Sequence, residues 1–118
     1  MRNPLLAPEL RELLQEERSE DLVEVLSDLH PNDAASILSG LETDEIVQVM
    51  ALLPLELRRD VFEYLEPEIQ EAIVIGSGRG QVKDLLSSMA SDVRADFLDS
   101  LDERVQAQLL PLLSNAAR

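Results

Sequence analysis

The chemically active side chains of this sequence are mainly carboxylates, which outnumber the basic side chains. The chain has 118 residues, of which 24 are Asp or Glu and 10 are Lys or Arg, so its formal net charge is −14. Carboxylates bind hard divalent cations such as Mg2+ and attract basic side chains, whereas a strongly negative surface repels phosphate backbones and anionic lipid. We therefore expect a cation or a basic protein as partner, and neither nucleic acid nor direct membrane insertion of this chain.

The acidic residues are densest around one short segment. Glu63 and Glu66 are three residues apart, as are Glu68 and Glu71, so each pair would share one face of a helix. A cation or a basic partner would relieve the repulsion within each pair, while a solvated face that keeps the protein soluble is the simpler interpretation. Residues 76–118 are different, because they hold only 6 acids against 5 basic residues.

The other polar side chains do not form a catalytic set. The chain has no Cys and a single His, His30, which has no nucleophile or acid placed with it in a recognisable motif. We expect no enzyme, no catalytic residue and no cofactor-binding residue. His30 precedes Pro31 at a predicted helix start, which favours a hydrogen bond there over a role in sensing pH. Arg58 and Arg59 are expected to pair with acids.

A twelve-residue repeat must position all of these side chains. Leucines stand at 29, 41, 53 and 65, and the same register reaches Leu5, Glu17, Ser77, Met89, Leu101 and Leu113, which we call the corner positions. An acid or Asn follows three residues after most of them, as the first turn of a helix favours. An apolar pair always follows eight and nine residues later. These pairs are Leu13-Leu14, Val25-Leu26, Ile37-Leu38, Val49-Met50, Val61-Phe62, Ile73-Val74, Leu85-Leu86, Phe97-Leu98 and Leu109-Leu110.

Each repeat therefore predicts one helix of about eight to ten residues and a tight turn. Helices this short are unstable alone and must stack on their neighbours. The sequence predicts an all-α fold, a right-handed superhelical stack (α-solenoid) of about nine short helices, in a single domain over residues 1–118. Residues 75–81 are the weak point, since three glycines surround Ser77. We expect a looser corner or hinge there, followed by a helix from about Val82 to Met89; the glycines lack the spacing of a phosphate-binding loop.

Three segments carry a family resemblance. They read LHPNDAASILSGL at 29–41, LLP at 52–54 and VFEYLEPEIQEAIV at 61–74. Over about residues 20–113 the chain resembles the N-terminal cytoplasmic domain of MgtE-type magnesium transporters. The resemblance implies a regulatory Mg2+-sensing domain on the cytoplasmic side of the inner membrane. Its implied partner is a CBS domain of the same transporter, held against it by Mg2+ when the channel closes.

The same resemblance implies two metal-binding residues. By register, the acids at the family's interface fall on Asp60 and Asp92. Mg2+ keeps several of its waters and takes one or two carboxylates from protein, so each side of an interface can supply part of a site. We accordingly expect weak binding of Mg2+ by this domain alone. Each Asp also has a simpler interpretation, as a solvated residue or as a helix-start acid.

Two other functions stay open at this point. One is a metal-independent scaffold for protein interaction, of the flagellar motor switch type, which also uses short-helix repeats. The other is a stand-alone acidic adaptor that binds a basic protein. In both, Mg2+ would do no more than screen charge.

Overall fold

The described part of the protein is entirely helical. A computed structural model describes residues 6–116, which form nine α-helices and no strand. The helices are α1 (Leu6–Gln15), α2 (Ser19–Ser27), α3 (Pro31–Leu38), α4 (Thr43–Leu52), α5 (Leu55–Phe62), α6 (Pro67–Gly76), α7 (Arg79–Ser88), α8 (Ser91–Asp99) and α9 (Glu103–Ala116). The all-α class and the number of helices are confirmed.

The helices begin where the repeat predicts. Pro31 and Pro67 are the first residues of α3 and α6, and Pro54 is the N-cap of α5. These positions suit proline because its missing N–H would be unpaired there in any case. Every described helix except α7 has an acid in its first turn, where a negative charge complements the helix dipole.

The corner positions from Glu17 to Leu101 lie between consecutive helices. Five of them are buried, namely Leu41, Leu53, Leu65, Met89 and Leu101. Leu5 lies outside the described residues. At the first described corner, Glu17 has φ 58°, in the left-handed region that residues with a side chain rarely adopt. The repeat thus fixes the place of this turn but supplies a residue that does not favour its conformation.

The apolar pairs form the core along the middle of the stack. Both members of each pair are buried from Ile37-Leu38 through Leu85-Leu86. The pairs at the two ends are less covered: Leu13 and Leu14 are half-buried, and Leu110 is 48% exposed. This gradient is typical of a repeat array, in which a terminal repeat has a neighbour on one side only.

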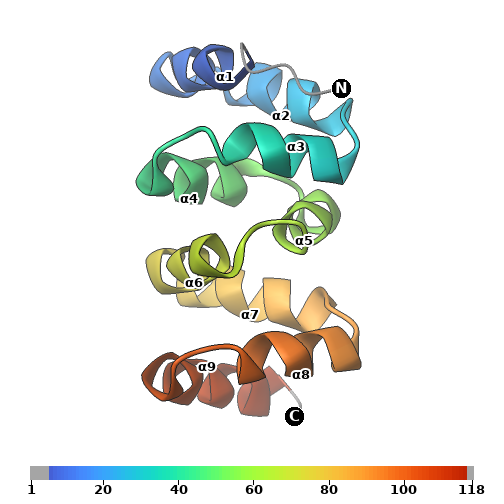
Figure 1. The fold of residues 1–118 in the computed structure, drawn as a ribbon, viewed down its shortest axis with the longest axis vertical. Coiled ribbons are helices and arrows are strands. Elements are labelled where there is room, and N and C mark those ends of the chain that lie inside the picture. Colours follow the sequence, from blue (N-terminus) through green and yellow to red (C-terminus); the bar gives the residue numbers. More distant parts are fainter. Residues whose placement is uncertain (1–5, 117–118) are drawn as a thin grey trace.

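The helices stack along the long axis of the molecule, with the two ends of the chain at opposite ends of the stack (Figure 1). The principal contacts join each odd-numbered helix to the next odd-numbered helix, from α1·α3 to α7·α9. They also join α4 to α6 and α1 to α2. The overall extents are 41 × 25 × 22 Å. The right-handed superhelical form of the stack stays a prediction. Among the described residues, no helix is both long and apolar enough to cross a bilayer.

Polar side chains tie consecutive helices together in the second half of the stack. Each lies five residues after a corner position and donates a hydrogen bond to a carbonyl eight residues earlier, in the last turn of the preceding helix. We call these hydrogen bonds the inter-helix caps. Arg58 donates to Met50 at 3.0 Å, Gln70 to Phe62 at 2.8 Å and Arg94 to Leu86 at 3.3 Å, and Gln106 donates to Leu98. They give these carbonyls a second donor, since each also accepts the backbone N–H of the corner residue three positions later. The equivalent residues Leu10, Leu22, Ala34 and Ile46, and Val82 in the second half, are instead buried in the core.

Two helix boundaries differ from the prediction. α7 begins at Arg79 and not near Val82, so only Ser77 and Gly78 separate it from α6. Gly78 suits the N-cap position, so Gly80 is the one glycine inside α7, and burial of Val82 and Leu85 outweighs its low helix preference. At the other end, α9 runs past the corner position Leu113 to Ala116. Whether residues 75–81 act as a hinge, and whether residues 1–118 are one domain, stay predictions.

Candidate functional site

Asp60 lies at the outer side of α5. The pair that follows it, Val61 and Phe62, is fully buried, and this anchors the end of α5 in the core. Because consecutive residues of a helix point in directions about 100° apart, the neighbour of a buried pair can face outward. The Asp60 side chain is 46% exposed.

Asp60 shares a hollow with residues from the start of α3. The hollow has a volume of about 430 Å³ and is lined by His30, Pro31, Asp60, Glu63 and Tyr64. We call it the α3–α5 hollow. It forms because α5 stacks directly on α3, which brings the start of one helix to the end of the other. His30, Asp60 and Glu63, which the sequence presents as separate features, therefore belong to one surface site.

His30 is fixed by two contacts. Its Nδ1 accepts a hydrogen bond from the backbone N–H of Asn32 at 3.1 Å, so it caps the N-terminus of α3. Its ring meets Tyr64 edge-on, with ring centroids 6.0 Å apart and an interplanar angle of 63°. The predicted hydrogen bond at this corner is confirmed. Since Nδ1 accepts, the proton of the neutral ring is on Nε2.

Arg59 connects the hollow to the next part of the stack. Its Nε donates to Oδ1 of Asp60 at 3.1 Å, and its Nη1 donates to the carbonyl of Ser88 at 3.4 Å. Arg59 therefore pairs with an acid, as predicted. For Arg58 that prediction is wrong, because its guanidinium donates to the carbonyls of Met50 and Leu53 at the end of α4.

Asp92 lies on another helix, in the first turn of α8. It is exposed, and the N-cap residue of α8 is Ala90. Asp92 is thus a helix-start acid, as its position in the repeat predicts. Arg59 reaches the carbonyl of Ser88, four residues before Asp92 in the chain, so one side chain contacts both Asp60 and the segment that leads to Asp92.

The four clustered glutamates are arranged differently from the prediction. Glu63 follows the last residue of α5 as its C-cap, whereas Glu66 is the N-cap of α6. A corner lies between them, so they do not share a helix face. Glu68 and Glu71 do lie three residues apart within α6. Only Glu63 of these four lines the α3–α5 hollow.

Tyr64 is the member of the hollow that sequence reasoning missed. It is 53% exposed, one residue before the buried corner residue Leu65. An aromatic residue at the outer side of a corner is a signal in the sequence, but its contact with His30 depends on how the two helices stack. Sequence alone therefore marks Tyr64 as exposed without saying what it touches.

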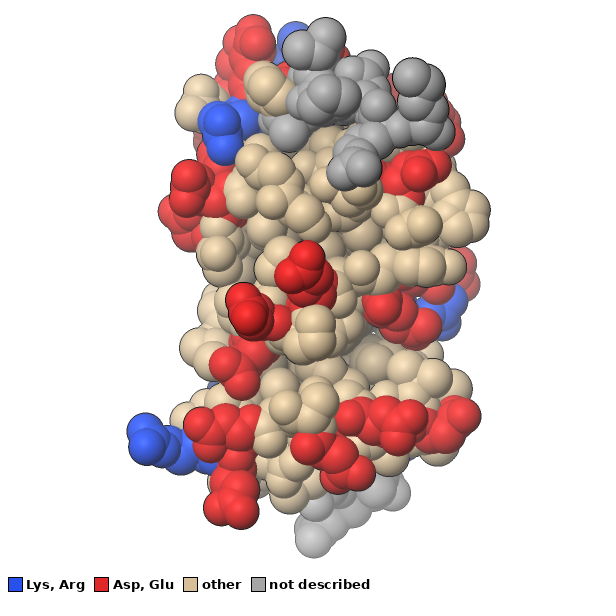
Figure 2. Space-filling view, viewed as in Figure 1, with Lys and Arg blue, Asp and Glu red and all other residues tan. Residues whose placement is uncertain are grey.

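Negative charge is spread widely over the molecule. On the face shown in Figure 2, acidic side chains occur from one end of the stack to the other, while basic side chains are few. Within residues 6–116, no group of three or more His, Asp or Glu side chains is placed to hold a metal ion. Asp60 and Asp92 are thus exposed carboxylates that each offer at most part of a coordination shell.

Comparison with known families matches residues 29–118 to the MgtE intracellular N domain. The chain belongs to this family. It is a family of intracellular domains of a magnesium transporter, not an enzyme family. The match begins at the corner before α3, so it includes the whole α3–α5 hollow, Asp60 and Asp92. A comparison with curated proteins finds no match.

Proposed function

We propose that this MgtE N domain is the regulatory Mg2+-sensing domain of a magnesium transporter, on the cytoplasmic side of the inner membrane. In this proposal Asp60 and Asp92 each contribute a carboxylate to Mg2+ bound between this domain and a CBS domain of the same transporter. The observation that carries the proposal is that both residues are exposed carboxylates within the region matched to the family.

The physical basis is charge repulsion between two acidic surfaces. A surface with a net charge of −14 resists approach by another acidic surface. A divalent cation between them cancels this repulsion while retaining much of its own hydration shell, because Mg2+ gives up its waters reluctantly. Binding that occurs only in the closed arrangement stabilises that arrangement in proportion to the logarithm of ion concentration. Closure would thus follow the Mg2+ level.

Mg2+ must compete with Arg59 for Asp60. Their 3.1 Å ion pair joins side chains that are 32% and 46% exposed. Exposed pairs of this kind contribute about 0–1 kcal/mol, so a divalent cation can displace the guanidinium at low cost. The hydrogen bond from Arg59 to Ser88 can remain after this exchange.

The test is a titration of the domain with MgCl2 followed by amide chemical shifts, with NaCl at matched ionic strength. We expect saturable changes around Asp60 and Asp92 with MgCl2 only. Asp60→Asn and Asp92→Asn should each weaken the response, whereas Asp99→Asn, an exposed acid at the end of α8, should not. Identical, diffuse responses to the two salts would contradict the proposal and favour a metal-independent role.

A further inference from the structure

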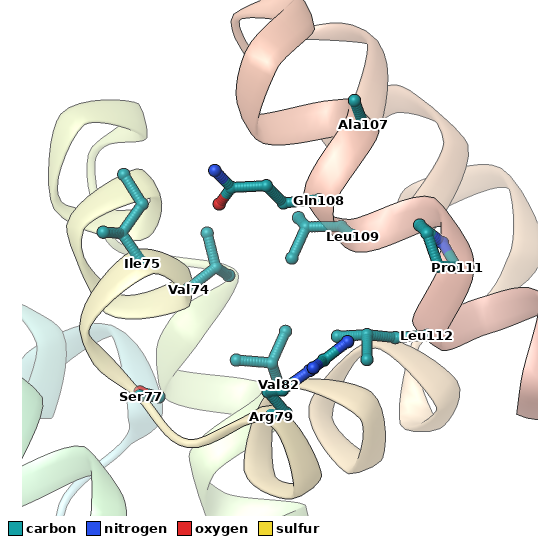
Figure 3. A pocket seen from close by; sticks show the side chains of 10 residues that line it. All are labelled: Val74, Ile75, Ser77, Arg79, Val82, Ala107, Gln108, Leu109, Pro111 and Leu112. Atoms are coloured by element: carbon teal, nitrogen blue, oxygen red, sulfur yellow. The ribbon is translucent and has the colours of Figure 1, made fainter.

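A second concavity, which shares no lining residue with the α3–α5 hollow, lies between α6 and α9. It has a volume of about 440 Å³, within the range of small-molecule sites. Val74 and Ile75 of α6 line one side, Leu109 and Leu112 of α9 line the other, and Val82 of α7 lies between them (Figure 3). We call it the α6–α9 groove.

The groove has both apolar and polar walls, the polar part formed by Ser77, Arg79 and Gln108, and its apolar part is incompletely covered. Ile75 is 58% exposed, more than any other large apolar side chain among the residues whose exposure is described. Covering apolar surface is worth about 25 cal/mol per Å². A chain of methylene groups lying between α6 and α9 would remove this surface from water. The exposed Ile75 thus favours a ligand with an apolar body.

Charge at the groove has the opposite sign to the rest of the molecule. Among the residues whose side chains the structure describes, Arg79 is the only charged one that lines the groove, and none of the lining residues is a carboxylate. Arg79 makes no ion pair with any side chain that the structure describes. In a protein with 24 acids, a groove whose one charged group is an unpaired cation is complementary to an anion.

The backbone beside Arg79 adds to this preference. Arg79 is the first residue of α7, whose N-cap Gly78 offers no side-chain hydrogen bond. α7 is also the one described helix without an acid in its first turn. The N–H groups and positive dipole end of α7 are thus not neutralised by the protein's own carboxylates. They lie next to Ser77 and Arg79, which both line the groove.

We propose that the α6–α9 groove binds a fatty acid. The alkyl chain lies between Val74 and Ile75 on one side and Leu109 and Leu112 on the other, and the carboxylate pairs with Arg79. A small ligand with a single charge suits this groove better than an acidic protein segment, because the net charge of −14 repels a partner with many carboxylates.

The test uses decanoate below its micellar concentration, with amide chemical shifts as the readout. Decylammonium, with the same chain and a positive head group, and acetate, with the head group alone, are the matched ligands. We expect saturable shifts in α6, α7 and α9 with decanoate and much weaker binding of the other two. Equal binding of decanoate and decylammonium, or no saturable response to decanoate, would overturn the proposal.

Variants test the two halves of the ligand separately. Arg79→Gln should weaken decanoate binding by about tenfold, since it removes one charged hydrogen bond. Arg104→Gln makes the same change in net charge at an exposed residue of α9 that does not line the groove, and it should leave binding unchanged. Ile75→Ser should weaken decanoate but not shift its preference over decylammonium. Equal losses in Arg79→Gln and Arg104→Gln would show a general charge effect and contradict the proposal.

A peptide is the alternative occupant. N-acetyl-Leu-Leu-Leu, with a blocked amino terminus and a free carboxyl terminus, carries the same charge on a bulkier apolar body. If the tripeptide binds at α6, α7 and α9 and decanoate does not, the groove recognises peptide termini and the fatty acid proposal is wrong. A rise in the melting temperature with decanoate, absent in Arg79→Gln, would support the proposal independently, because a ligand of the folded state stabilises it.

Discussion

Asp60 has a counter-ion next to it in the chain, and this arrangement matters for any cation that binds there. Arg59 donates to Asp60 and also to the carbonyl of Ser88, so it is held between two elements of the stack. A bound cation must therefore replace a partner that the fold keeps in place. The response of Asp60 to Mg2+ then depends on Arg59 as much as on the carboxylate itself.

Arg59→Gln is expected to increase the affinity for Mg2+ by up to about fivefold, because the competing ion pair contributes up to about 1 kcal/mol. The measurement is the midpoint of the MgCl2 titration at Asp60. Arg104→Gln serves as control for the change in net charge, since Arg104 is exposed on α9. An equal shift of the midpoint in both variants would mean that Arg59 acts only through the overall field.

Glu45 is a carboxylate whose pKa the fold lowers. Its carboxylate accepts from Nε of Arg11 at 3.0 and 3.1 Å and from the backbone N–H of Glu42 at 2.9 Å. The Arg11 hydrogen bond, followed by that of Glu42, lowers the pKa of Glu45 below its ordinary value. The Glu45 side chain is only 15% exposed, so solvent screens this interaction less than it screens most surface pairs.

The lowered pKa of Glu45 makes a prediction about acid stability. A carboxylate whose pKa is depressed by folding stabilises the folded state above its unfolded pKa, and this contribution disappears as the pH falls through its folded pKa. Glu45→Gln should therefore lower the free energy of unfolding at pH 7, and the difference from wild type should shrink as the pH falls below the ordinary pKa of Glu. Chemical denaturation at several pH values measures it. A difference that does not change with pH would mean that charge is not the cause.

At the scale of the element, the inter-helix caps divide the stack into two kinds of junction. Arg58, Gln70, Arg94 and Gln106 join helices through hydrogen bonds to carbonyls, whereas the first helices use buried apolar residues at the same repeat position. The polar junctions add a side-chain donor to carbonyls that otherwise accept only a backbone N–H. The second half of the stack thereby keeps its helices in register with fewer buried apolar side chains at this position.

Gln70→Ala should lower the free energy of unfolding by about 1 kcal/mol, the typical loss when a hydrogen bond to a partly buried carbonyl is removed. Gln48→Ala is the control, because Gln48 is an exposed residue of α4. Urea denaturation of both variants measures the difference. Equal stabilities for the two variants would show that water replaces Gln70 at the Phe62 carbonyl without loss.

Helix positions were predictable from sequence because their determinants are local. Corner residues, first-turn acids and apolar pairs recur every twelve residues, and each acts within its own repeat. The start of α7 was not predictable in the same way. Glycine disfavours helix by about 1 kcal/mol relative to alanine, and burial of Val82 and Leu85 outweighs this preference.

At the scale of the whole molecule, the site depends on contacts between repeats. His30 and Tyr64 are 34 positions apart, and they meet only because α5 stacks on α3. Repeat register alone placed Asp60 and Asp92 on different helices but could not show that Arg59 contacts both Asp60 and the chain just before α8. These contacts depend on the angles between helices, which a single sequence does not specify.

The net charge also has a consequence for the whole fold. The extents of 41 × 25 × 22 Å compare with a screening length of about 30 Å at 0.01 M salt and about 8 Å at 0.15 M. At the lower concentration nearly all the acids repel one another. We expect the melting temperature to rise by a few degrees between these NaCl concentrations, and equally with KCl. An unchanged or lower melting temperature would show that the local ion pairs outweigh the general repulsion.

The stacking pattern bears on how the protein is made. The principal contacts join helices that are adjacent or next but one along the chain, so no major contact waits for a distant segment. Contacts of such short range allow fast folding, and synthesis delivers the chain from its N-terminus. The first helices can therefore assemble while the ribosome is still adding the last, and each new repeat finds a surface already formed on which to fold.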